Sequence, residues 1–280
     1  MPNSMQTIGS LTRIFKEKKW KPLFDSMGID AFGDFIKLFK GLSKDETNLV
    51  LTLLEDYLYV DANSMLKHFR MIFKSIGEDL IANYYSKVIF VPLRKENSLS
   101  TKSQTYALYP AFHALRQLTK NKVTVSSYDR IEALSTKEKN RQGALILLVD
   151  DFIGTGDTAL KAYEKYNSKY RVDTDDPAIL TIACLGSGKQ KIQNKNIQLW
   201  HSIEQSKGIS ESSRIQKKLD ALEIMKQISS KLRVRPDYYL GYKSSEGLIS
   251  MSVRTPNNTF PLFWCPKDSS GNEWPAPFYR

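Results

Sequence analysis

The stretch that decides the fold is Leu145-Ile-Leu-Leu-Val149-Asp150-Asp151-Phe-Ile-Gly154-Thr155-Gly156-Asp157-Thr158. It predicts a buried strand that ends in two carboxylates, followed by a tight turn and the start of a helix. Five apolar residues bounded by polar ones are typical of a strand covered on both faces in a parallel sheet. In open sheets of this kind, ligands bind just outside the C-terminal ends of the strands. We therefore expect the carboxylates to lie at a binding site.

The turn and the helix start have the chemistry of an anion site. A helix start offers unpaired backbone N–H groups and the positive end of a dipole, and a glycine lets the backbone approach an anion closely. The predicted phosphate-binding residues are Thr155, Gly156, Asp157 and Thr158. Asp150 and Asp151 can accept hydrogen bonds from a diol or hold a hydrated metal ion. A phosphorylated pentose carries both groups, and the alternative is a purely structural turn capped by Thr and Asp.

Bulk properties are those of an ordinary globular protein. The chain has 280 residues, 41% of them hydrophobic, enough for one large domain or two small ones. No segment approaches the roughly 18 uninterrupted apolar residues of a membrane helix, and Met1 to Pro22 lacks the apolar region of a secretory signal. We therefore expect a cytoplasmic protein without membrane association. Cys184 and Cys265 lack metal-ligand spacing and are expected to be reduced structural residues.

The charge is strongly basic, because 41 Lys and Arg residues against 30 Asp and Glu residues leave a net charge of +11. A field of that sign favours polyanionic partners. Basic residues gather in four clusters, at 13–21, 137–141, 186–191 and 214–218. These clusters fit either solvated faces or a surface for nucleic acid or a nucleoprotein complex, and no nucleic-acid-binding signature accompanies them.

The first of three predicted regions, residues 1–80, has helical patterns. Ser43 to Glu46 is a capping box, and two apolar stripes at helical spacing follow it. Both stripes predict core packing, and His68 lies off the second one, where a surface position is expected. The stripe residues are Val50, Leu53, Leu54, Tyr57 and Leu58, then Met65, Phe69, Ile72, Phe73 and Ile76.

The second region, residues 81–235, alternates short β-branched runs with helical patterns, which implies a parallel sheet flanked by helices. Residues 126–143 are polar and charged, so we expect either a lid over the site or a segment without a catalytic role. His113 and His201 are isolated and are interpreted as structural. The predicted strands cover residues 88–91, 123–125, 144–149 and 178–183.

The run Val149 to Thr158 resembles the phosphoribosyl pyrophosphate (PRPP) motif of type I phosphoribosyltransferases, in which apolar residues precede two acidic ones and a Thr-Gly-x-Thr loop. The resemblance implies the α/β fold of that family, contacts of Asp150 and Asp151 with the ribose hydroxyls, and a 5′-phosphate in the loop. It also implies a transferase that displaces pyrophosphate from C1 of the sugar. Mg²⁺ is the implied cofactor, bridging sugar hydroxyls and diphosphate oxygens near the acid pair.

Two positions depart from that family's pattern. Gly154 stands where members acting on 6-oxopurines carry an acidic residue, which disfavours hypoxanthine or guanine as the acceptor. The loop at 92–98 has no glycine, although the family usually holds pyrophosphate with a Gly-containing turn there. Arg94 and Lys95 are the predicted side-chain contacts to the diphosphate. The family's flexible loop corresponds to the predicted lid, whose further candidates are Lys137, Lys139 and Arg141.

The third region, residues 236–280, is rich in proline and aromatic residues and is predicted as strand and loop. It is either an extended strap packed by its rings or a β-rich hood that selects the acceptor. In the second case Asn257 and Asn258 read donor and acceptor edges, and an aromatic residue such as Trp264 stacks on a base. With the Asp-Asp loop, this ending resembles phosphoribosyltransferase-like effectors of bacterial conflict and anti-phage systems, some encoded beside retrons.

Three functions stay open. The leading hypothesis is a phosphoribosyltransferase-like enzyme that binds PRPP or a nucleotide, with a role as a bacterial defence or toxin effector in nucleotide metabolism. The second is a catalytically inactive nucleotide-sensing or nucleoprotein-binding module. The third is an effector that modifies a cellular nucleotide and is held inactive by a partner.

Overall fold

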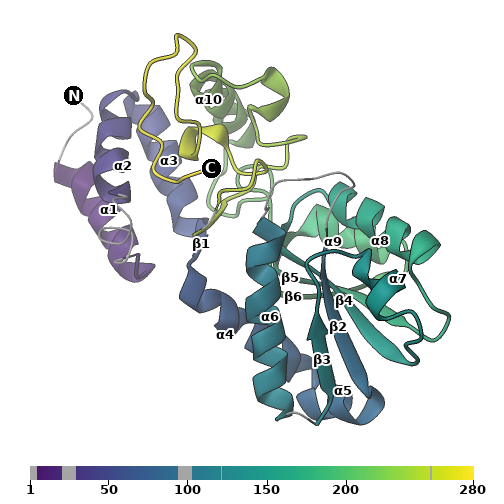
Figure 1. Cartoon of the computed structure of the whole chain (residues 1–280). Coiled ribbons are helices and arrows are strands. Elements are labelled where there is room, and N and C mark those ends of the chain that lie inside the picture. Colours follow the sequence, from purple (N-terminus) through teal and green to yellow (C-terminus); the bar gives the residue numbers. More distant parts are fainter. Residues whose placement is uncertain (1–4, 21–29, 94–102, 121, 253) are drawn as a thin grey trace. The chain divides into compact units, whose positions relative to one another are not determined.

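The computed structural model describes residues 5–20, 30–93, 103–120, 122–252 and 254–280, and Figure 1 shows the chain. The chain divides into two compact units. One unit combines residues 1–60 with 206–280, and the other comprises residues 61–205. The middle of the chain thus forms one unit, and its two ends together form the other. This grouping differs from the boundaries expected near residues 80 and 235, and those boundaries stay a prediction.

The middle unit, 61–205, has an α/β fold with a fully parallel five-stranded sheet in the order β3-β2-β4-β5-β6. All four predicted strands are confirmed. The fifth, β6, was not predicted, because half-buried polar residues interrupt the apolar pattern of this edge strand. The strands are β2 (Lys87–Pro92), β3 (Thr124–Ser127), β4 (Ala144–Ile153), β5 (Asp176–Leu185) and β6 (Gln198–Gln205).

Helices cover both faces of this sheet (Figure 1). On one face, Phe90 of β2 contacts Phe73 of α4 and Phe112 of α6. Its neighbours Ile89 and Val91 point the other way and belong to a core cluster with residues of α7, α8 and α9. The helices are α4 (Ala62–Ile76), α5 (Glu78–Tyr84), α6 (Ser103–Thr119), α7 (Ala133–Lys137), α8 (Asp157–Lys169) and α9 (Gly186–Gln193).

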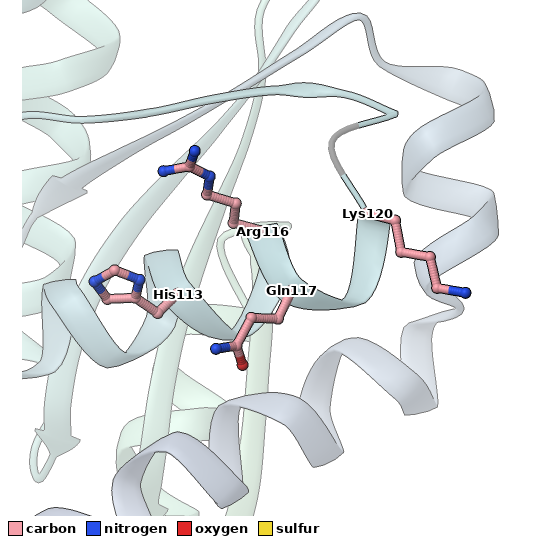
Figure 2. A pocket seen from close by; sticks show the side chains of 4 residues that line it. All are labelled: His113, Arg116, Gln117 and Lys120. Carbon is pink, nitrogen blue, oxygen red and sulfur yellow. The ribbon is translucent and has the colours of Figure 1, made fainter.

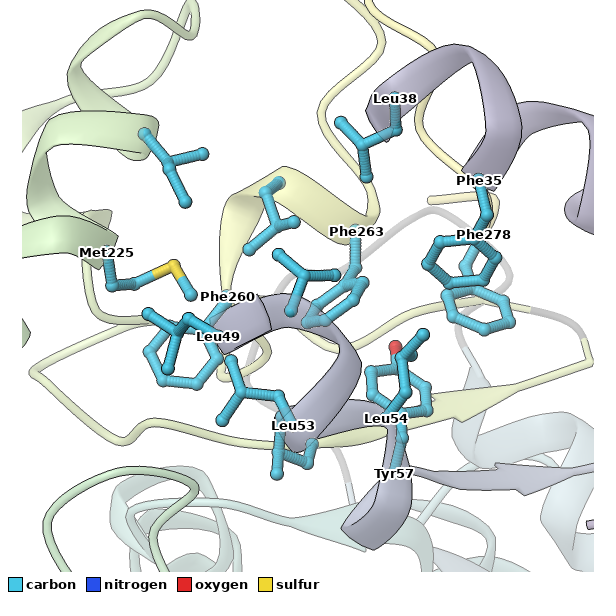
Figure 3. Close-up of a cluster of buried hydrophobic side chains, with 14 of the residues drawn as sticks. Phe35, Leu38, Leu49, Leu53, Leu54, Tyr57, Met225, Phe260, Phe263 and Phe278 are labelled. Atoms are coloured by element: carbon cyan, nitrogen blue, oxygen red, sulfur yellow. The ribbon is translucent and has the colours of Figure 1, made fainter. Parts of the chain in front are cut away.

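The other unit is built around an aromatic core drawn from both ends of the chain (Figure 3). The ring of Tyr57 stacks on Phe278 with 4.8 Å between ring centroids, and Phe263 lies at the same distance from Tyr57. Strands β1 (Leu58–Val60) and β7 (Ile249–Met251) pair in parallel beside this core. The helices are α1 (Met5–Glu17), α2 (Ala31–Lys40), α3 (Lys44–Asp56) and α10 (Lys218–Ser230), with 3-10 turns η2 (Pro236–Tyr238) and η3 (Pro261–Phe263).

The helical character predicted for the N-terminal region is confirmed, except at the end of the first stripe: α3 ends at Asp56, so Tyr57 lies outside the helix and Leu58 begins β1. The capping box at the start of α3 is present, since the Ser43 amide donates to Glu46 and the Glu46 amide donates to the Ser43 hydroxyl. Across the described part of 236–280, β7 is the only strand, and most of the segment expected to be β-rich has no regular secondary structure. No helix among the described residues is long and apolar enough to cross a membrane.

Candidate functional site

The acid pair lies at the C-terminal end of the central strand. Asp150 and Asp151 are each only 5% exposed, and every residue of β4 is buried, as the apolar run predicted. In the register of the sheet, Asp150 stands opposite Thr181 of β5, and the preceding Val149 stands opposite Pro92 of β2. Strand β5 therefore continues alongside the acid pair, while the pairing with β2 ends at the residue before it.

Local hydrogen bonds orient both carboxylates. The Asp151 amide donates to Oδ1 of Asp150, and the Phe152 amide donates to Oδ1 of Asp151, each at 2.9 Å. Burial, followed by the charge of Asp151 and a hydrogen bond between the two side chains, raises the pKa of Asp150 well above its ordinary value. Asp150 is therefore expected to keep its proton to a higher pH than an ordinary aspartate does. A cation or a set of hydroxyl donors placed against the pair would lower that pKa.

The loop after β4 is pressed backbone to backbone against α9. Gly156 has a φ of +76°, a left-handed conformation that favours glycine. A Cβ added to Gly188 of α9 would lie 2.1 Å from the carbonyl oxygen of Gly154 and 3.2 Å from the amide nitrogen of Gly156. Since no side chain fits in that space, glycine at 188 is what allows the loop to take this path.

The start of α8 has donors available for an anion. Gly156 is its N-cap residue and supplies no side-chain capping bond. The Thr155 hydroxyl donates to Asp157 at 3.0 Å, and Lys191 of α9 forms an ion pair with the same carboxylate. A phosphate at this helix start would meet backbone N–H groups, the helix dipole and the ammonium of Lys191.

The acid pair fits a magnesium ion that is held mainly by a substrate. Mg²⁺ prefers oxygen ligands and usually binds through one or two carboxylates, several waters and substrate phosphates. Asp150 and Asp151 supply two such carboxylates, and the coupling that raises the Asp150 pKa would be relieved by a divalent cation. Among the described residues, no group of three or more His, Cys, Asp or Glu side chains could form an all-protein metal site.

The structure describes only some of the predicted pyrophosphate contacts. Arg94 and Lys95 lie outside the described residues. The guanidinium of Arg141 is bound into a buried ion pair with Asp175, with side chains 1% and 0% exposed, and it also donates to the backbone carbonyls of Leu134 and Glu138. Arg141 therefore stabilises the segment that leads into β4, and the suggestion that it meets pyrophosphate is wrong.

The acceptor candidates belong to the unit formed by the two ends of the chain. The amide of Asn258 donates to the Ser245 hydroxyl at 3.1 Å, and the indole of Trp264 donates to the Thr259 carbonyl at 2.8 Å. The Arg280 guanidinium lies over the Trp264 ring, 4.6 Å from its centroid. Asn257 is half-buried. These contacts are those of a packed segment, and base recognition by Asn257, Asn258 and Trp264 stays a prediction.

Two histidines have environments that the sequence did not predict. His68 is half-buried, and its Nδ1 lies 2.9 Å from the Ser202 hydroxyl of β6. Its expected surface position is therefore wrong. His201 stands opposite Thr181 in the register of the sheet, and burial lowers its pKa. Both imidazoles are therefore expected to be neutral at pH 7.

Gly188 and Lys191 were missed as site residues. Both come from α9, which follows β5, while the predicted loop follows β4. The signal in the sequence is Gly186-Ser-Gly188 directly after a strand of buried residues, followed by two lysines. Because parallel strands end at the same edge of a sheet, the segments that follow neighbouring strands meet there.

Comparisons with known proteins agree with this geometry at the level of the family. Residues 32–280 match the family described as PRTase-CE. The adenine phosphoribosyltransferase of Campylobacter jejuni subsp. jejuni serotype O:23/36 (strain 81-176) is 31% identical over 163 residues, covering 53% of this chain and 76% of that protein.

Solved structures give weaker matches. The hypoxanthine-guanine phosphoribosyltransferase of Schistosoma mansoni in complex with IMP is 10% identical, with a TM-score of 0.33 over 53% of this chain and 67% of that one. A hypothetical protein from Neisseria gonorrhoeae with bound ppGpp is 11% identical, with a TM-score of 0.34 over 54% of this chain and 85% of that one.

Proposed function

The chain belongs to the PRTase-CE family, a type I phosphoribosyltransferase-like family, and from that premise we propose that it binds PRPP or a nucleotide at the C-terminal end of β4. One observation carries the proposal. A buried acid pair, a left-handed glycine and a helix start without a side-chain cap follow one another within seven residues. The acids suit the ribose hydroxyls, and the loop from Thr155 to Thr158 suits the 5′-phosphate.

The proposed reaction is phosphoribosyl transfer. A nitrogen of the acceptor forms a bond to C1 of the sugar, the bond from C1 to the pyrophosphate oxygen breaks, and pyrophosphate leaves with the bonding electron pair. Positive charge develops at C1 and the ring oxygen, as in glycoside hydrolysis. Asp150 and Asp151 would orient the ribose hydroxyls and stabilise that charge from a buried position. Bound Mg²⁺ would neutralise charge on the leaving pyrophosphate.

For the acceptor, we propose a base other than a 6-oxopurine. Gly154 carries no side chain that could accept a proton from such a base, and its carbonyl packs against α9. The relative from Campylobacter jejuni is named as an adenine phosphoribosyltransferase, which makes adenine the first acceptor to test. Incubation with PRPP, Mg²⁺ and adenine, hypoxanthine or guanine in parallel, followed by mass spectrometry, compares them directly. Transfer to hypoxanthine or guanine alone would contradict the proposal.

Binding is tested by calorimetric titration of PRPP with Mg²⁺ into the wild type and into the double variant Asp150→Asn/Asp151→Asn. We expect at least a 100-fold loss of affinity, because both ribose contacts weaken. The matched control is Asp129→Asn/Asp173→Asn, which removes the same charge at exposed positions. Equal affinity of the acid-pair variant and the wild type, with both folded by circular dichroism, would contradict the site.

The same site would also suit the second function, a nucleotide sensor without turnover. Such a module would bind PRPP or a nucleotide, lose binding in the acid-pair variant, and release no pyrophosphate with any acceptor. A pyrophosphate-release assay run beside the calorimetry separates the two functions.

We extend the proposal to a bacterial effector in a conflict system that acts on nucleotide metabolism. Its support is the resemblance of the Asp-Asp loop and the C-terminal segment to such effectors. Expression without a partner is expected to arrest growth, and Asp150→Asn/Asp151→Asn is expected to restore it. Unimpaired growth at confirmed wild-type expression, or continued arrest with the folded variant, would contradict this role.

A further inference from the structure

One face of α6 carries a row of exposed aromatic and basic side chains. Tyr106, Tyr109, His113 and Arg116 follow one another at three- or four-residue spacing, so they lie on one side of the helix, and Lys120 comes directly after its last residue, Thr119. Tyr106 is 51% exposed and Tyr109 is 56% exposed, unusually high for rings of that size. The row extends over about 21 Å, at 1.5 Å per residue.

A second row of cations lies on the neighbouring helix. Lys67, Arg70 and Lys74 are exposed on α4, again at spacings of three and four residues. Arg70 donates a hydrogen bond to Gln117 of α6, which ties the two rows together. The opposite sides of both helices pack into the unit, through residues such as Phe73 of α4 and Phe112 of α6.

Neither helix contains a carboxylate. The sequences of α4 and α6 hold no Asp or Glu over Ala62–Ile76 and Ser103–Thr119. Of the other helices of this unit, α5 contains Glu78 and Asp79 and α8 contains Asp157 and Glu164, while the short helices α7 and α9 also hold no Asp or Glu. The positive field of α4 and α6 is therefore not offset within these elements, and it adds to the net charge of +11.

The row on α6 borders a hollow in the surface. Figure 2 shows His113, Arg116, Gln117 and Lys120, all from α6 and its C-terminal end, lining a cavity of about 360 Å³. The described residues of its lining are a histidine, an arginine, a glutamine and a lysine, with no acid among them. Such a hollow can take a phosphate group from a chain that runs along the helix.

We propose that the outward face of α6, together with the exposed cations of α4, binds single-stranded nucleic acid. Proteins that hold single strands combine a basic track along the phosphates with aromatic side chains on which bases stack. Here the tyrosines occupy one end of the row and the cations the other. A duplex offers no unstacked base to Tyr106 and Tyr109, so the aromatic part of the row favours a single strand. This function is separate from PRPP binding and does not depend on it.

The test is fluorescence anisotropy of the full chain with a labelled 15-nucleotide strand, as DNA and as RNA of the same sequence, and with the matching duplex. Tyr106→Ala/Tyr109→Ala is expected to weaken single-strand binding by about 10-fold or more, because each stacked base contributes strongly to affinity. Arg116→Ser/Lys120→Ser is expected to weaken it similarly. It should also reduce the slope of log K against log salt by about 1.4, since single strands lose about 0.7 per phosphate contact.

The controls remove the same number of exposed tyrosines or cations elsewhere. Tyr84→Ala/Tyr279→Ala removes two other exposed tyrosines, and Lys195→Ser/Lys217→Ser removes two other exposed lysines. Both are expected to bind like the wild type, and all variants should bind PRPP like the wild type. The proposal is overturned if no strand binds, if the control variants lose as much affinity as the α6 variants, or if duplex binds as tightly and the tyrosine variant has no effect. The DNA and RNA arms show which single strand is preferred.

Discussion

Asp150 keeps its proton more tightly in the folded chain than an ordinary aspartate does, because burial and the charge of Asp151 both oppose ionisation. An acid whose pKa is higher in the folded state than in the unfolded state binds more protons when folded. Between those two pKa values, the free energy of unfolding therefore falls as pH rises. The candidate site thus lowers the stability of the fold at neutral pH.

Asp150→Asn is accordingly expected to raise the melting temperature at pH 8 by a few degrees, because about 1 kcal/mol corresponds to about 2–4 °C in a domain of this size. The gain should shrink toward pH 4, because the folded acid is protonated there and the unfolded acid, with a pKa of about 3.9, is close to half protonated. Thermal denaturation between pH 4 and pH 8 measures it, with the exposed Asp173→Asn as the control. A lower melting temperature than wild type at pH 8 would contradict the assigned pKa direction.

Arg141 is a second residue whose role depends on burial. It donates to both oxygens of Asp175, which also accepts from the Tyr166 hydroxyl and the Val172 amide. Arg141→Met would leave the Asp175 charge buried without its cation. We expect a loss of about 3–5 kcal/mol in the free energy of unfolding, measured with urea.

The control for that change is Arg130→Met. Arg130 pairs with Asp129 at 3.8 Å, and both side chains are at least 70% exposed. Exposed pairs contribute about 0–1 kcal/mol, so little change is expected. Similar losses for the two variants would show that Arg141 contributes no more than a surface pair.

At the scale of the element, the contact between the loop before α8 and the start of α9 positions the predicted phosphate site. Gly188→Ala would place a Cβ 2.1 Å from the Gly154 carbonyl oxygen, so the loop or α9 must shift. We expect weaker PRPP binding by calorimetry and a lower melting temperature. Gly9→Ala is the control, since a Cβ there meets nothing within 4 Å and helix interiors favour alanine by about 0.5–1 kcal/mol. Wild-type PRPP affinity in Gly188→Ala would contradict this role.

The sequence predicted these elements correctly where the local residue pattern matches the burial and the hydrogen bonds of those residues in the folded chain. The apolar run before Asp150 predicted β4, and the capping box at Ser43 predicted the start of α3. It failed at β6, an edge strand with half-buried polar residues, and at Gly188, whose constraint comes from a loop more than thirty residues earlier. A local pattern does not record which distant backbone approaches a glycine.

At the scale of the whole molecule, the two units have separate hydrophobic cores. The aromatic core around Tyr57 and Phe263 draws its members from residues 1–60 and 206–280, while the core around β4 lies within residues 61–205. We therefore expect two transitions in differential scanning calorimetry. PRPP with Mg²⁺ at 100 times its Kd should raise the free energy of unfolding of the 61–205 unit by about 2.7 kcal/mol, so the transition of that unit should move to a higher temperature.

Phe263→Ala provides the complementary change. Phe263 is fully buried, and replacing a buried phenylalanine with alanine costs about 3–5 kcal/mol of stability. The transition that PRPP does not shift should therefore move to a lower temperature. The exposed Tyr279→Ala is the control. One transition that responds to both PRPP and Phe263→Ala would show that the two units unfold together.

The sequence by itself determined the parallel strand, the acid pair at its end, the glycine loop and the helical start of the chain, because each depends on neighbours within a few residues. Tertiary structure alone decided that the two ends of the chain share one core and that Arg141 is bound to Asp175. It also decided that position 188 must lack a side chain, because the loop that contains Gly154 packs directly against it. It also decided that α4 and α6, two helices without a carboxylate, are joined through the hydrogen bond from Arg70 to Gln117. These features depend on which distant segments meet in the fold. The burial and the charged neighbours of a residue at such a contact are determined only once the chain has folded.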